Sequence, residues 1–113
     1  MVIDSTQLDR VFGALSDTTR RGILAQLADG ARNVRQLTAP YNMSQPAISK
    51  HLRVLEGAGL IERWKIGRET HVRAKPETAK EAAAWIAHYS QFWEQHFDAV
   101  EQILQQRRSQ NED

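Results

Sequence analysis

The stretch that most constrains the fold runs over residues 44–61, because it specifies a helix with both ends marked. Ser44 is a good N-cap, since its hydroxyl can accept a hydrogen bond from a free backbone N–H of the first turn. Pro46 falls in that first turn, where its missing N–H costs nothing. Gly57 and Gly59 indicate the end, because glycine readily adopts the left-handed conformation that closes a helix.

This predicted helix has two chemically different faces. Ile48, Leu52 and Leu55 recur at spacings of four and three and therefore share one apolar side. The other side offers an amide, a hydroxyl, an ammonium and a guanidinium, and no carboxylate precedes Glu56; these outward residues are Gln45, Ser49 and Arg53, with Pro46 and Lys50 beside them. Gln and Arg suit base edges, and Ser and Lys suit phosphate oxygens. The pattern therefore predicts a recognition helix for the DNA major groove.

The residues before this helix predict a second, shorter one. Asn33 can cap a short helix that contains Leu37, and Pro40 disfavours its continuation. Met43 precedes the next cap and is expected to pack beneath the recognition helix as a hydrophobic staple. Residues 33–57 are therefore predicted to form a helix-turn-helix.

Residues 60–74 predict a two-stranded β-hairpin, since two runs rich in β-forming side chains flank Gly67. Lys65 and Arg68 lie at or near its tip. A basic tip directly after a recognition helix favours a wing that contacts the DNA backbone or minor groove. The alternative is a solvated hairpin that only covers the domain.

Long helices are predicted at both ends, over residues 4–15 and 76–108. The first carries one apolar stripe and the last carries two, which implies more than one packing partner. Left exposed, the aromatic content of the last helix would form a large apolar patch. We therefore expect a two-fold symmetric homodimer, with these dimerisation residues: Leu8, Val11, Phe12, Trp85, Ile86, Tyr89, Phe92, Trp93 and Val100.

Composition narrows the function classes. With 113 residues, the chain is expected to form a single, mostly α-helical winged helix-turn-helix domain over 1–113. Residues 44–75 hold seven basic and three acidic side chains, whereas the other residues hold eight and eleven, so positive charge is concentrated in the middle. The absence of cysteine excludes disulfides and thiolate metal sites. The longest apolar run, 82–87, is too short to span a bilayer, so we expect a cytoplasmic protein with no membrane partner.

Four motifs together resemble the ArsR-type winged-helix repressors: residues 17–24, 44–52, 55–61 and 67–68. The resemblance covers about residues 5–75 in motif terms. It implies a homodimer that binds a near-palindromic DNA operator and represses transcription. It also implies that Gly67 and Arg68 belong to the wing and that five recognition-helix residues lie at the DNA: Gln45, Ala47, Ser49, Lys50 and Arg53.

The full set of expected DNA contacts combines the residue patterns with this resemblance: Ser44, Gln45, Pro46, Ala47, Ser49, Lys50, Arg53, Lys65, Gly67 and Arg68. His51 is interpreted as a packing residue of the recognition helix. Arg20 and Arg21 leave two interpretations open. They form ion pairs with Asp17 or another segment, or they contact phosphate.

Other functions have less support in the sequence. A metal-responsive repressor would need His and carboxylate ligands for zinc or nickel, and the last helix offers His88, Glu94, His96, Asp98 and Glu101. The Asp-x-His start of the metal-sensing family motif is missing, so no metal and no cofactor are predicted. The aromatic residues of this helix are expected to form the dimer core, or alternatively a pocket for an unidentified small-molecule effector.

Catalysis is not expected, because no nucleophile is paired with a base. Ser49 and His51 are two residues apart on a helix and point in different directions. A phosphate-binding loop is also missing, since the glycines at 57 and 59 end a helix instead of preceding one. The remaining alternative is a winged helix that binds only protein, because fold alone does not determine function.

Overall fold

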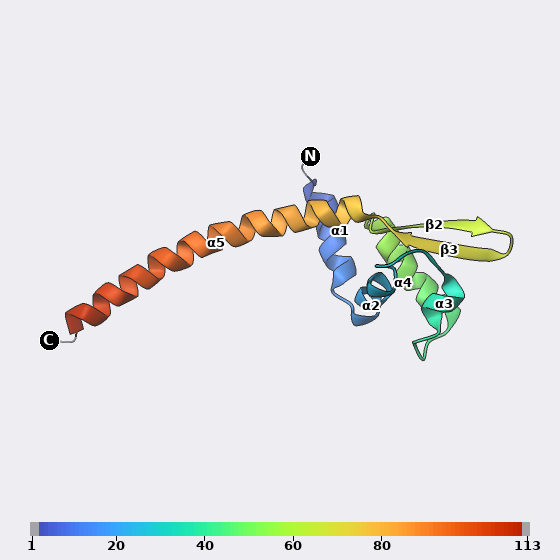
Figure 1. Ribbon diagram of the computed structural model, residues 1–113, viewed down its shortest axis with the longest axis horizontal. Coiled ribbons are helices and arrows are strands. Elements are labelled where there is room, and N and C mark those ends of the chain that lie inside the picture. The colour runs from blue at the N-terminus through green and yellow to red at the C-terminus, as the bar shows by residue number, and fades with distance from the viewer. Residues whose placement is uncertain (1–2, 112–113) are drawn as a thin grey trace. The chain divides into compact units, whose positions relative to one another are not determined.

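The computed structural model describes residues 3–111, which form helices with one small sheet (Figure 1). In chain order the elements are α1 (Ser5–Leu15), α2 (Thr18–Gln26), β1 (Arg32–Asn33), α3 (Val34–Thr38), α4 (Gln45–Gly57), β2 (Ile61–Ile66), β3 (Glu69–Ala74) and α5 (Pro76–Asn111). The chain divides after Ala82 into two compact units. The first contains all three strands and α1 to α4, and the second is the helical remainder of α5.

The predicted capping residues start the two helices of the helix-turn-helix. The Ser44 hydroxyl accepts from the Ala47 backbone N–H at 3.3 Å. Asn33 and Gln36 form a reciprocal capping box, with contacts of 2.8 and 2.9 Å. Helix α4 ends at Gly57, and the chain turns at Gly59, whose φ of +78° lies in the left-handed region. These local signals confirm the predicted helix-turn-helix.

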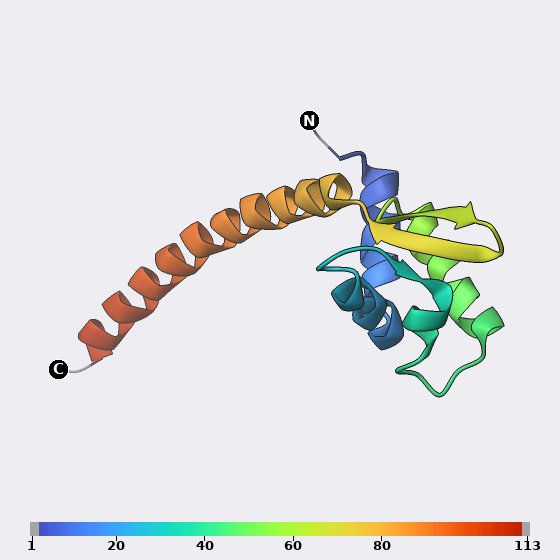
Figure 2. The ribbon, with the colours of Figure 1, turned by 45° about the vertical axis from the view of Figure 1, so that its right-hand side comes forward.

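The predicted β-hairpin is confirmed as β2 and β3, and a third strand that was not predicted joins it in an antiparallel sheet of order β1-β3-β2. Strands β2 and β3 pair from Ile61↔Ala74 to Ile66↔Glu69 and turn at Gly67, where φ is +61°. The additional strand β1 pairs Arg32 with Val72. A two-residue strand carries no alternating pattern, so it forms only because the chain before α3 passes the edge of β3. Figure 2 shows the β2–β3 ribbon projecting from the helices as a wing.

The hydrophobic core lies entirely within the first unit, where α4 inserts its apolar side among α1, α2, α3 and the sheet. The side chains of Ile48, Leu52 and Leu55 are fully buried, as predicted. Met43 packs against this core and accepts a contact from the Thr19 hydroxyl at 4.0 Å. This packing holds the helix so that its opposite side faces outward.

Helix α5 extends three residues beyond its predicted end, to Asn111. Thr78 and Ala82, near its start, are buried in the first unit. Every residue from 83 to 111 is exposed. None of the helices within residues 3–111 is long and apolar enough to cross a lipid bilayer.

Candidate nucleic-acid interface

The outward side of α4 carries the polar residues expected at the DNA. Gln45, Lys50 and Arg53 are exposed, whereas Ala47 and Ser49 are half-buried at the edge of this surface. The N-cap residue Ser44 and Pro46, two residues later, are exposed as well. The outward surface of α4 therefore presents amide, ammonium and guanidinium groups to solvent, with hydroxyl groups beside them.

A groove lies between α4, the start of α3 and the wing, and it joins residues that are far apart in the sequence. Gln45 and Ser49 line it from α4, and Arg68 lines it from the wing. The remaining lining residues are Asn33, Val34, Arg35, Arg63, Glu69 and Thr70. Three of the nine lining residues are arginines and one is acidic, so the groove offers cationic donors suited to phosphate and base edges.

The structure does not gather every predicted residue into this groove. Lys65 and Arg68 are both exposed near the wing tip, but only Arg68 lines the groove. Lys50 and Arg53 also lie outside it, on the exposed side of α4. Within residues 3–111, no side-chain hydrogen bond or ion pair occupies six of the predicted contacts: Gln45, Ser49, Lys50, Arg53, Lys65 and Arg68. Their donors are therefore available to a ligand.

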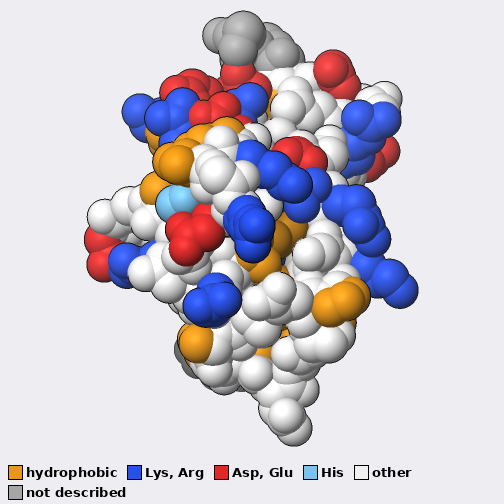
Figure 3. All heavy atoms as spheres, turned by 90° about the vertical axis from the view of Figure 1, so that its right-hand side faces the viewer, with side chains coloured by type: hydrophobic (Ala, Val, Ile, Leu, Met, Phe, Trp, Pro, Cys, Tyr) orange, Lys and Arg blue, Asp and Glu red, His pale blue; other side chains and the backbone are white. Residues whose placement is uncertain are grey.

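Figure 3 views the molecule from the wing end. Lys and Arg side chains form several patches across this face, with smaller acidic areas between them. A mixed surface with a cationic excess attracts a polyanion without forming one uniform charged field. The charge distribution agrees with the basic character of residues 44–75.

Sequence reasoning missed two arginines of the groove, Arg35 and Arg63. Arg35 is exposed on α3, directly after the capping box, and this position was the available signal. Arg63 instead pairs with the Glu56 carboxylate through contacts of 2.9 and 3.2 Å. The hydrogen bond from Arg63 lowers the pKa of Glu56, and the charge of Arg63 lowers it further. This pair joins the end of α4 to strand β2.

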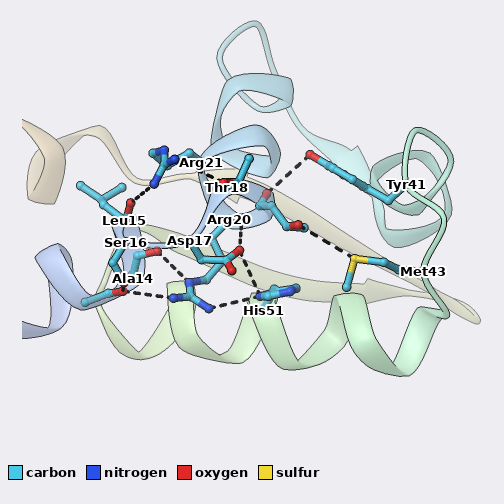
Figure 4. Close-up of polar contacts among 12 residues, drawn as sticks. Ala14, Leu15, Ser16, Asp17, Thr18, Arg20, Arg21, Tyr41, Met43 and His51 are labelled. Carbon is cyan, nitrogen blue, oxygen red and sulfur yellow. Dashed lines mark hydrogen bonds and ion pairs between the residues drawn. The ribbon is translucent and has the colours of Figure 1, made fainter.

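A polar cluster fixes α4 to the preceding helices (Figure 4). The Arg20 guanidinium donates to the carbonyl oxygens of Ala14 and Gly13, at 2.7 and 3.1 Å, and lies 3.2 Å from Nδ1 of His51. Arg20 therefore connects the end of α1 with the recognition helix. His51 is half-buried in this cluster, as expected for a packing residue.

The two interpretations of the arginines at the start of α2 can now be separated. Arg21 donates to the carbonyl oxygen of Leu15 at 2.7 Å, beside the carbonyls that bind Arg20. Helix ends leave such carbonyls without intrahelical donors, so the two guanidinium groups satisfy the end of α1. These contacts support the structural interpretation, but the acceptors are carbonyl oxygens and not the expected ion-pair partner, which was Asp17 or another segment. Asp17 instead caps α2 by accepting from the Arg20 backbone N–H at 3.0 Å.

The same cap changes the acidity of Asp17. The hydrogen bond from the Arg20 backbone lowers the pKa of Asp17, and His51, whose Nδ1 lies 3.8 Å from the carboxylate, lowers it further. Asp17 is therefore ionised across the neutral range, where it stabilises the start of α2.

The predicted dimerisation residues of α1 and those of α5 differ in their exposure. Val11 is a correction, because its side chain is 0% exposed and packs inside the core of its own chain. Leu8 is half-buried against that core, and Phe12 is exposed. Those on α5 all remain exposed: Trp85, Ile86, Tyr89, Phe92, Trp93 and Val100.

The aromatic residues of α5 contact one another along the helix. The rings of Trp85 and Tyr89 stack with centroids 5.2 Å apart, and Tyr89 meets Trp93 edge-on at 5.8 Å. Phe92 lies 4.2 Å from the ring of His96. Although they touch within the helix, these side chains leave 40% or more of their surface exposed. Such an apolar surface is typical of a protein interface.

The candidate metal ligands of α5 do not form a cluster. In the part of the chain that the structure describes, no group of three or more His, Asp or Glu side chains is arranged to hold a metal ion. The ring of His96 instead contacts the backbone carbonyl of Phe92, with Nδ1 3.2 Å from the oxygen.

Comparison with known proteins places this geometry in a family. The profile described as "Bacterial regulatory protein, arsR family" matches residues 17–63, which include α2, α3 and α4. The arsenical resistance operon repressor of Escherichia coli K12 is 33% identical over 103 residues, covering 90% of this chain and 86% of that protein. The chain belongs to the ArsR family, and it is a DNA-binding transcriptional regulator with a winged helix-turn-helix fold.

Solved structures agree with this assignment. The crystal structure of an ArsR family transcriptional regulator is 35% identical, with a TM-score of 0.77, and covers 83% of this chain and 97% of its own. A solution structure from Mycobacterium bovis, described as a homodimeric winged helix-turn-helix DNA-binding domain, is 28% identical with a TM-score of 0.62. It covers 80% of this chain and 85% of its own.

Proposed function

We propose that the protein is a homodimeric repressor that binds a near-palindromic operator through α4 and the wing. The observation that carries this proposal is the groove that brings Gln45 and Ser49 of α4 together with Arg68 of the wing. In a two-fold dimer, two such surfaces would enter successive major grooves about 34 Å apart. Such a regulator would act in the cytoplasm, where bacterial DNA lies.

The exposed side chains suggest a division of roles at the DNA. Gln45 and Arg53 can each form two hydrogen bonds with a base edge, Gln with adenine and Arg with guanine. Lys50, Lys65 and Arg68 carry charges suited to phosphate oxygens, which position the protein without selecting a sequence. Ser44, Pro46, Ala47 and Ser49 would line the close approach of α4, and Gly67 would shape the wing. Arg35, which sequence reasoning missed, is added to the phosphate contacts.

The dimer of the proposal rests on apolar surface that a single chain leaves exposed. Phe12 of α1 and the exposed aromatic residues of α5 supply that surface. The Mycobacterium bovis relative is described as a homodimer, which supports the same assembly here. We assign the aromatic residues of α5 to the dimer core and not to an effector pocket. The chain has no cysteine, so an effector would have to act without a thiolate site.

The decisive test combines an operator selected from random DNA with variants of the two proposed roles. The wild-type protein enriches a duplex from a random pool, and fluorescence anisotropy then compares this duplex with a scrambled one at two salt concentrations. Arg53→Ala and Gln45→Ala should each weaken binding to the operator by about 1–3 kcal/mol and reduce its preference over the scrambled duplex.

Lys50→Ala and Arg68→Ala serve as the matched contrast. Each should weaken binding to both duplexes similarly and reduce the salt slope by about 0.9 for each lost phosphate contact. Glu94→Ala is the control. It changes an exposed residue of α5, outside the proposed DNA surface, and should leave DNA affinity unchanged. Unchanged operator affinity in all four interface variants would overturn the assignment of these surfaces. Binding that does not respond to salt would instead favour a protein partner.

A further inference from the structure

The tip of the wing carries an apolar side chain between two cationic ones. Ile66 is 60% exposed, the largest exposed fraction of any large hydrophobic residue in the described residues 3–82. It is the last residue of β2 and lies between Lys65 and the Gly67–Arg68 turn. An isolated exposed isoleucine needs no explanation. This one, however, lies at the end of a projecting hairpin, next to Lys65 and close to Arg68 in the chain, so the tip has both apolar and cationic side chains.

The hairpin holds this side chain firmly. Ile66 pairs with Glu69 in the last rung of the β2–β3 register, next to the turn at Gly67. Two rungs earlier, and therefore on the same face, Trp64 stacks on His71 with ring centroids 5.9 Å apart. The isoleucine is branched at Cβ, so its first side-chain torsion is restricted. Strand pairing and the branched Cβ therefore both restrict the orientation of the Ile66 side chain.

The charges around Ile66 favour a nucleic acid. Lys65 and Arg68 flank it, and neither forms an ion pair within residues 3–111. Glu69 is the acidic residue of the tip, and its Oε2 lies 3.5 Å from Nε2 of His71. Glu69, Ile66 and His71 share one face of the hairpin, so this contact engages the carboxylate beside the isoleucine. The tip thus combines an exposed apolar side chain with two cationic side chains and one carboxylate that is already in contact with His71.

From this arrangement we infer that Ile66 is an apolar wedge that enters the DNA minor groove beside the operator, while Lys65 and Arg68 bind the phosphates along its edges. The inference rests on the proposed DNA interface and adds a mode of sequence selection to it. Apolar wedges partly unstack a base step, and TA steps unstack most easily. The wing should therefore prefer flanks that contain TA steps over G·C-rich flanks, although Ile66 forms no hydrogen bond with a base.

The test uses the operator core with two flanks, one of alternating T·A pairs and one of alternating G·C pairs, and a third duplex with a scrambled core. Adenines of the first flank are replaced one at a time by 2-aminopurine, whose fluorescence rises when it unstacks. The wild-type protein should favour the T·A flank by roughly three- to tenfold and raise the fluorescence at one step. Ile66→Ser should lose both effects, and Ile66→Leu should retain them.

Lys65→Ala is the matched control at the neighbouring position. It should weaken binding to both flanks equally and leave the flank preference intact, because it removes a phosphate contact. An Ile66→Ser protein with the flank preference and fluorescence change of the wild type would overturn the inference, as would a wild-type protein with neither effect. Failure of the proposed function itself would look different, since the wild type would then not distinguish the operator core from the scrambled core.

Discussion

The two units of this chain differ in whether they bury their apolar side chains. In residues 3–82, fourteen hydrophobic side chains are buried in one core. In residues 83–111 every side chain is exposed, although large apolar ones recur there from Trp85 to Leu104. The first unit is complete by itself, because its apolar faces meet one another. The second unit instead exposes its large apolar side chains, and this difference is the physical basis of the proposed dimer.

The polar groups of the first unit fall into two sets. In the first unit, the carbonyl oxygens at the end of α1 are bound by Arg20 and Arg21, and Glu56 is paired with Arg63. On the outward side of α4 and on the wing, by contrast, side chains such as Arg53 and Arg68 form no hydrogen bond or ion pair within residues 3–111. The surface proposed for DNA therefore has donors available for a ligand, and the surface proposed for a second chain has exposed apolar side chains.

The largest expected effect comes from placing a charge in the second unit. Trp93→Glu would bury a carboxylate in the proposed dimer core, where loss of an aromatic anchor alone costs about 2 kcal/mol or more. We expect dissociation to monomers, seen by sedimentation velocity, together with loss of operator affinity. Glu94→Ala is the neighbouring control and should remain dimeric. A Trp93→Glu protein with the sedimentation coefficient of the wild type would remove α5 from the interface.

A smaller loss is expected from the polar cluster of the first unit. Arg20→Ala removes the donor to the Ala14 carbonyl and one of the donors to the Gly13 carbonyl, which still accepts from Ser16, and should lower the free energy of unfolding by about 2 kcal/mol. Arg21→Ala, at an exposed position, should cost less than about 1 kcal/mol. Urea unfolding monitored by circular dichroism measures both. Equal losses in the two variants would show that Arg20 has no special role in linking α1 to α4.

A steric test comes next. A Cβ added at Gly22 would lie 2.2 Å from the hydroxyl oxygen of Tyr41, so Gly22→Ala should force that ring away and destabilise the first unit by about 1–2 kcal/mol. Tyr41→Phe removes the hydroxyl and should recover part of this loss in the double variant. At Gly13 nothing lies within 4 Å of the added Cβ, so Gly13→Ala should instead raise stability by roughly 0.5–1 kcal/mol. Thermal unfolding of the wild type and the four variants provides the comparison. A Gly22→Ala protein as stable as the wild type would argue against this packing.

The smallest effect concerns pH. Because Arg63 lowers the folded-state pKa of Glu56, their pairing contributes stability above the pKa of unfolded Glu56, and this contribution is lost as the pH falls through the lower, folded value. The pair is partly solvent-exposed, so its contribution should stay below about 1 kcal/mol. Glu56→Gln should therefore be slightly less stable than wild type at pH 7 and equal to it near pH 3. A difference that persists at pH 3 would assign the effect to packing and not to charge.

The sequence predicted best what depends on neighbours in the chain. The Ser44 cap, the apolar side of α4 and the turn at Gly67 are local signals, and each appears in the structure where it was expected. Strand β1 was missed because its two residues form a strand only by pairing with β3. The contact of Arg20 with His51 was missed for a similar reason, since it joins residues 31 positions apart.

In the candidate site, too, the sequence predicted the local features and missed the contacts between distant elements. The predicted contacts of α4 are outward-facing because the helical period alone places them opposite the core. The groove, however, includes Arg35 from α3 and Arg63 from β2, and only the packing of those elements beside α4 brings them there. Val11 was misplaced because a helical stripe does not reveal whether its partner is the same chain or a second one.

The central claim is that two copies of the α4 and wing surface read DNA together, and selection of duplexes from a random pool tests it most directly. The account predicts enrichment of a two-fold symmetric motif whose half-sites are about 10 base pairs apart, centre to centre. Affinity for this motif should fall steeply as salt is raised. A pool that shows no enriched sequence, with weak binding to every duplex, would contradict the account.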